Sequence, residues 1–172
     1  MPLSLIAGPA NAGKVEMLLD RYLAALEREP VLIVPNRSDV GRVERELLAR
    51  RPALFAGSIG TFDDVFERVA NAGDEARPVV PGAQRALLVR RVLANAQLDR
   101  LAASARFGGF ADALQQALSE LESGLLDPAE LAGDLATLYA AYRDELDRLG
   151  RWDRDLLRRS AAERLQSELD AW

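Results

Sequence analysis

The segment GPANAGKV, residues 8–15, has the residue types and nearly the spacing of a phosphate-binding loop. That motif places four residues between two glycines, then a lysine, then a serine or threonine. Gly8, Gly13 and Lys14 fit, whereas Val15 stands where the hydroxyl side chain is expected. The loop backbone and Lys14 could hold phosphate oxygens, but a magnesium ion would lose one oxygen ligand. ATP and Mg²⁺ are therefore the cofactors this segment suggests, with binding expected to be weakened or lost.

Lys14 is the only lysine among the 22 basic residues of the sequence, and the others are all arginine. A slim ammonium group reaches between phosphate oxygens, where a planar guanidinium fits poorly. A chain that otherwise avoids lysine thus keeps one at the position where the motif requires it.

The flanking segments suit such a loop. Residues 3–8 form an apolar run that predicts a buried strand, and residues 14–29 carry apolar side chains at helical spacing. Backbone N–H groups at a helix N-terminus attract anions. A second strand is expected over residues 31–35, followed by a helix, and this alternation predicts a parallel sheet. The apolar positions are Met17, Leu18, Tyr22 and Leu26 in the first helix, and Val40, Val43 and Leu47 in the second.

Thr61 and Asp64 have the spacing of a helix N-cap, in front of an apolar face formed by Phe62, Val65, Phe66 and Val69. From about residue 81 onward the pattern is helical, with a break of small residues at 103–109. One helix is expected over residues 127–150, started by an Asp127–Glu130 capping box and stopped by Gly150. A last helix is expected from about residue 153.

Composition limits the chemistry. The sequence has no cysteine and no histidine, so it offers no disulfide, no thiolate or imidazole metal ligand and no iron–sulfur ligand. We assign no catalytic residue and no metal site. With 27 acidic and 22 basic residues, bulk charge does not draw the chain to DNA. The sequence lacks a signal-peptide pattern and an apolar run of membrane-spanning length, so a cytoplasmic protein without a membrane partner is expected.

The order of these segments resembles the N-terminal region of the B subunit of AddAB-type helicase-nucleases. The matching segments, which span nearly the whole chain, are the phosphate loop, LIVPN, GSIGTFDDVFERV, and the helical stretches FGGFADALQQALSELESGLLDPAEL and LYAAYRDELDRLGRWDRDLLRRSAAERL. Such subunits are similar to superfamily 1 DNA helicases in their first half and end in a PD-(D/E)XK nuclease domain. The resemblance implies an α/β fold: a partial RecA-like P-loop domain over residues 1–75, with an inserted or appended all-helical subdomain over 76–172.

The resemblance also implies roles for particular residues. Gly8, Gly13, Lys14 and Val15 take the positions of the nucleotide-binding loop, with Val15 departing from the family pattern. Two further segments, Asn36–Arg37 and Thr61–Phe62, take positions that contact single-stranded DNA in superfamily 1 helicases. The implied partners are single-stranded DNA, bound weakly by this chain alone, and a helicase-nuclease subunit of the AddA type.

Two features of a complete enzyme of this kind are missing from the sequence. No apolar strand-like run ends in the carboxylate that would hold a metal and orient water, and no nuclease motif is present. We therefore expect an N-terminal fragment of a protein that processes DNA ends in double-strand-break repair, inactive by itself. The alternatives are a small P-loop kinase or NTPase, and a non-catalytic helical interaction module.

Overall fold

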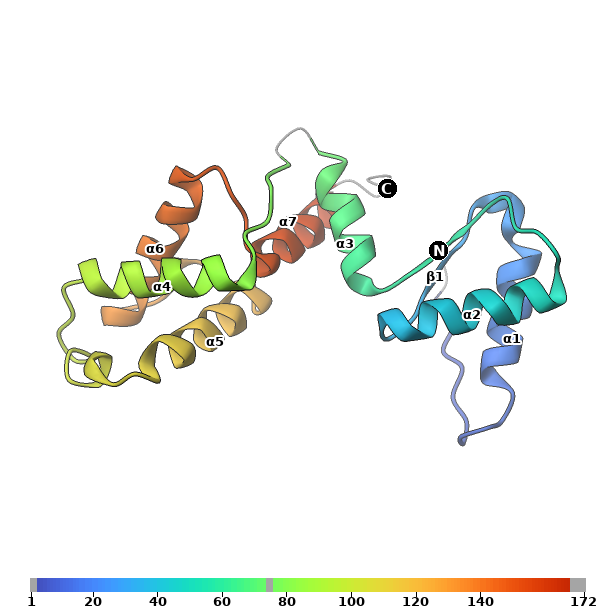
Figure 1. Cartoon of the computed structure of the whole chain (residues 1–172), viewed down its shortest axis with the longest axis horizontal. Helices are drawn as coiled ribbons and strands as arrows, with labels where there is room; N and C mark the ends of the chain where they lie inside the picture. The colour runs from blue at the N-terminus through green and yellow to red at the C-terminus, as the bar shows by residue number, and fades with distance from the viewer. Residues whose placement is uncertain (1–2, 74–75, 168–172) are drawn as a thin grey trace. The chain divides into compact units, whose positions relative to one another are not determined.

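The computed structural model describes residues 3–73 and 76–167. The chain is mostly helical and contains a two-stranded parallel sheet, so the architecture is mixed α/β (Figure 1). It divides into two compact units, Met1–Val65 and Phe66–Trp172, here called the N-terminal and C-terminal units. Each unit contains its own cluster of buried apolar side chains.

The sheet of the N-terminal unit is built from β1 (Val31–Ile33) and β2 (Ser58–Gly60). The strands run parallel, with Leu32 opposite Ile59. Parallel neighbours need a crossover connection, and helix α2 (Arg37–Arg50) provides it. Helix α1 (Lys14–Ala24) and a 3₁₀ turn (Leu26–Arg28) precede β1, and helix α3 (Phe62–Asn71) follows β2.

The core of the N-terminal unit joins both helices to the sheet. Leu32 and Ile59 pack with Leu19 and Tyr22 of α1 and with Leu47 of α2. The predicted stripe on α2 is confirmed, since Val43 and Leu47 are buried and Val40 packs against them.

On α1 the predicted stripe is partly wrong. Tyr22 and Leu26 are buried, but the third buried position is Leu19, whereas Met17 and Leu18 are substantially exposed. The sequence offered three consecutive apolar residues here, and periodicity could not select the inward one. Packing against the sheet selects Leu19.

The strand expected over residues 3–8 is not formed. Leu3 and Leu5 are 98% and 90% exposed. A strand needs a neighbour to accept its ladder of hydrogen bonds. β1 and β2 pair with each other within the described residues, and residues 3–8 add no strand to that sheet.

The described part of the C-terminal unit is helical apart from one isolated bridge between Val79 and Trp152. Helix α4 packs against α5 and α6, and α5 packs against α7 (Figure 1). The predicted break at 103–109 is confirmed and contains a 3₁₀ turn, Ser104–Arg106. The long helices are α4 (Gly82–Asn95), α5 (Phe110–Ser123), α6 (Gly133–Arg148) and α7 (Arg154–Ser167).

The single helix expected over residues 127–150 is interrupted. Its capping box exists, with the Asp127 N–H donating to the Glu130 carboxylate at 2.7 Å, but it caps only the 3₁₀ turn Pro128–Glu130. Gly133, the first residue of α6, has a φ of +68°, which glycine adopts without strain and which separates α6 from the preceding 3₁₀ turn. The predicted stop is confirmed, since Gly150 has a φ of +60° just after α6.

None of the helices within the described residues is both long and apolar enough to cross a membrane.

Candidate functional site

The glycine loop leads directly into α1. Gly13 is the residue before the helix and has a φ of +74°, a conformation that favours glycine. Lys14, the first helical residue, turns its side chain back over the loop. Its ammonium group donates to the backbone carbonyls of Gly8, at 2.7 Å, and Pro9. The Lys14 side chain therefore bridges its own loop. A bound phosphate would have to displace these two carbonyls as acceptors of the Lys14 ammonium group.

A hollow of about 490 Å³ lies beside this loop. Its size is within the range of small-molecule sites. Three cations line it, Lys14, Arg42 and Arg50, together with two carboxylates, and the lining includes no serine or threonine hydroxyl. Val15 is half exposed at its rim. These residues fit a phosphate group better than a phosphate-bound magnesium ion, because the hydroxyl ligand of the metal is replaced by a methyl group.

The first of the two other candidate segments lies at the carboxyl end of β1. Asn36 caps helix α2, since its side-chain oxygen accepts the N–H of Asp39 at 3.0 Å. The Asn36 amide also donates to the Asp39 carboxylate at 2.8 Å. Arg37 follows as the first residue of α2, with its side chain 78% exposed.

The second segment lies at the carboxyl end of β2. The predicted cap of α3 is confirmed: the Thr61 N–H and hydroxyl both donate to Asp64 Oδ2, at 2.7 and 2.9 Å. Phe62, the next residue, is 61% exposed. The expectation that it belongs to the apolar core face of α3 is therefore wrong, whereas Val69 of that face is fully buried.

An ion pair joins the two segments. Arg37 holds both oxygens of the Asp64 carboxylate, at 3.0 Å to Oδ1 and 3.3 Å to Oδ2. The Thr61 hydrogen bonds, from its backbone and then its hydroxyl, hold the pKa of Asp64 below its ordinary value, and the charge of Arg37 adds to this effect. The carboxylate therefore stays ionised at neutral pH.

The structure thus brings Asn36, Arg37, Thr61 and Phe62 to one edge of the sheet, where the two parallel strands end. Such edges are where parallel sheets bind their ligands. Sequence reasoning identified Asp64 only as a cap and missed its pairing with Arg37, because the two residues are 27 positions apart. It also missed Arg42 and Arg50 beside the loop.

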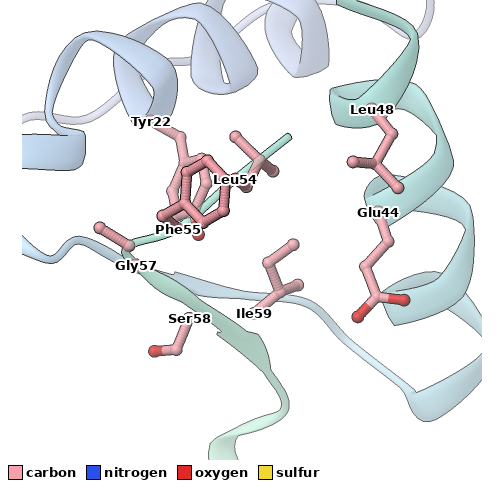
Figure 2. A pocket seen from close by; sticks show the side chains of 9 residues that line it. Tyr22, Glu44, Leu48, Leu54, Phe55, Gly57, Ser58 and Ile59 are labelled. Atoms are coloured by element: carbon pink, nitrogen blue, oxygen red, sulfur yellow. The ribbon is translucent and has the colours of Figure 1, made fainter. Parts of the chain in front are cut away.

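A second hollow of the N-terminal unit, of about 380 Å³, is lined by both apolar and polar groups. Glu44 and Leu48 line it from α2, and Leu54 and Phe55 line it from the segment that precedes β2 (Figure 2). Phe55 is 98% exposed. No pattern in the sequence indicates this surface, because an apolar residue between two elements is typical of a core position.

The C-terminal unit contains a buried polar cluster between its helices. Arg85 of α4 contacts Asp153 at 3.2 Å and Asp155 at 3.0 Å, and it donates to Ser119 of α5. Tyr142 of α6 donates to Asp153 at 2.6 Å. Each of these polar groups has a partner, so the cluster connects the four helices and leaves no unpaired group among these five side chains for chemistry.

No group of three or more carboxylates suited to a metal ion occurs within residues 3–73 and 76–167. No protein-family model matches the chain, and no curated protein sequence matches it.

Proposed function

We propose that this chain is the helicase-like start of an AddB-like subunit and that it contributes a single-stranded DNA contact and a degenerate nucleotide loop. In this proposal the N-terminal unit corresponds to part of a RecA-like P-loop domain. The parent protein would process DNA double-strand ends for recombinational repair together with a subunit of the AddA type.

One observation carries the proposal. The two segments that the family resemblance assigns to DNA contact are 24 or more positions apart in sequence, yet they end neighbouring parallel strands. The Arg37–Asp64 ion pair joins them. A chance likeness of short motifs would not require Asn36–Arg37 and Thr61–Phe62 to form one continuous surface.

The side chains on this surface suit single-stranded DNA. Arg37 supplies a positive charge for phosphate, while Asn36 and Thr61 carry hydrogen-bond donors. The exposed ring of Phe62 can stack on a base, which supplies roughly 1–3 kcal/mol per base in proteins that bind single strands.

The nucleotide loop has a smaller role. Lys14 and the glycine loop suit a phosphate, but Val15 removes a ligand from the magnesium ion that neutralises charge during phosphoryl transfer. The loop therefore retains at most weak ATP affinity, and this chain does not turn ATP over.

The affinity for DNA is expected to be low. The chain has a net charge of −5, and Asp63 and Asp64 lie beside the proposed contact residues. Phosphate contacts made by a single arginine give a shallow dependence on salt, because few counterions are released.

Fluorescence anisotropy with a labelled oligo(dT) tests the proposal. Arg37→Ala should weaken binding and make the salt dependence shallower by about 1. Arg45→Ala removes the same charge from the same helix and serves as the control. It should leave the salt dependence of binding nearer to that of the unmodified chain. Absence of binding at low salt, or equal effects of the two variants, would remove this surface as the DNA site.

A further inference from the structure

The carboxylate of Asp64 occupies the donors that a phosphate would use on the proposed DNA surface. Its Oδ2 accepts the Thr61 N–H and the Thr61 hydroxyl, and both of its oxygens face the Arg37 guanidinium. All of these groups lie at the carboxyl ends of the two strands or in the first turns of the following helices.

We infer that Asp64 is an internal competitor for DNA phosphate, which regulates the affinity of this surface by occupying Arg37 and Thr61. The inference rests on the proposed function. A DNA phosphate that approaches Arg37 has to displace the carboxylate or share the guanidinium with it, and in either case it meets a negative charge.

The competition has a limited strength. Exposed ion pairs are weak, because water and salt screen them. Arg37 is largely exposed, so the carboxylate lowers DNA affinity without abolishing it. Asp64 thereby keeps the surface selective for a ligand that also stacks on Phe62, since a lone phosphate gains too little from Arg37.

The cap of α3 explains why the carboxylate stays in place. Asp64 stabilises the first turn of the helix through Thr61, and this role is separable from its charge. An asparagine at the same position keeps one side-chain oxygen that can accept the Thr61 N–H, while it loses the negative charge that holds Arg37.

The decisive variant is therefore Asp64→Asn, measured in the full chain by oligo(dT) anisotropy over a range of salt concentrations. We expect roughly two- to fivefold tighter binding and a steeper salt dependence, because Arg37 no longer shares its charge with a carboxylate. Glu44→Gln makes the same change in net charge elsewhere in the N-terminal unit and should reproduce neither effect in full. In an Arg37→Ala background, Asp64→Asn should raise the affinity for oligo(dT) no more than the Glu44→Gln control does.

Thermal unfolding of each variant separates a charge effect from a capping effect. A lower Tm for Asp64→Asn with DNA affinity equal to that of Glu44→Gln would show that Asp64 only caps the helix, and would overturn the inference. The proposed function would still hold in that case if the unmodified chain binds oligo(dT) and Arg37→Ala weakens this binding. If neither the unmodified chain nor Asp64→Asn binds oligo(dT), both the proposed function and the inference are wrong.

Discussion

Tyr142 donates its hydroxyl hydrogen to Asp153 Oδ2 across 2.6 Å, and both side chains are fully buried in the C-terminal unit. The pKa of Tyr142 is raised because burial, and then the charge of Asp153, disfavours the phenolate. The hydroxyl therefore remains a donor throughout the pH range in which the protein is handled. This bond connects α6 to the start of α7, since Asp153 also caps α7 by accepting the Leu156 N–H at 2.8 Å.

Tyr142→Phe should lower the free energy of unfolding of the C-terminal unit by about 1–3 kcal/mol, because a buried carboxylate loses one of its donors. Urea denaturation monitored by circular dichroism measures this change. Thr137→Val, which removes an exposed hydroxyl from the same helix, is the control and should have an effect within about 0.5 kcal/mol. Equal midpoints for Tyr142→Phe and the unmodified chain would show that the bond is not stabilising.

Asp134 gives the stability of the C-terminal unit a pH dependence. The N–H groups of Asp99 and Leu101 donate to its two oxygens, at 3.0 and 2.7 Å, and lower its pKa. The folded state then binds a proton less readily than the unfolded state. The resulting stabilisation is fully present above the unfolded pKa, about 4, and is lost as the pH falls toward the folded pKa.

Asp134→Asn should therefore lower the free energy of unfolding at pH 6. At pH 3 the free energies of unfolding of the variant and the unmodified chain should differ less. Urea titrations at pH 6, 4 and 3 provide the comparison. A difference between the two proteins that stays constant over this range would contradict the assigned role of the Asp134 charge.

The purified chain should show little or no ATP hydrolysis. Val15 cannot ligate magnesium, and neither β1 nor β2 ends in a carboxylate. Binding of a fluorescent ATP analogue, if detectable, should not depend on Mg²⁺ in the unmodified chain, whereas Val15→Thr should introduce a dependence. Steady turnover by the unmodified chain that Lys14→Ala abolishes would overturn this prediction.

The N-terminal unit should associate with itself at high concentration. Leu3, Leu5 and Phe55 are almost fully exposed, and Phe55 borders the hollow of Figure 2. Exposed apolar patches promote association. In sedimentation velocity, Phe55→Ser should reduce self-association. Phe107→Ser, at an exposed position in the C-terminal unit, should reduce it less. A strictly monomeric chain at all accessible concentrations would refute the prediction.

The sequence predicted best those features that depend on neighbouring residues. The Thr61–Asp64 cap, the stop at Gly150 and the stripe of Val43 and Leu47 follow from turn chemistry and periodicity, and all are present. The strand over residues 3–8 was wrong, because an apolar run cannot form a strand without a partner, and the partner is a matter of tertiary structure.

The charged contacts could not be predicted from the sequence. Arg37 and Asp64 are 27 positions apart, and Arg85 lies 57 positions from Tyr142, so no local pattern connects them. Only the pairing of β1 with β2 and the packing of the helices bring these groups together. The same limit applies to Phe62, whose position on an apparent apolar face suggested burial that the fold does not provide.

Photo-cross-linking can locate the residues of this chain that contact single-stranded DNA. The full chain is irradiated with an oligonucleotide that contains 5-iodouracil, which forms adducts with aromatic side chains that stack on it, and the adducts are located by mass spectrometry. We expect a principal adduct at Phe62, reduced by Arg37→Ala and by excess unlabelled single strand. Cross-links confined to the C-terminal unit, or none under conditions in which DNA is bound, would contradict the assignment of DNA contact to the carboxyl ends of β1 and β2.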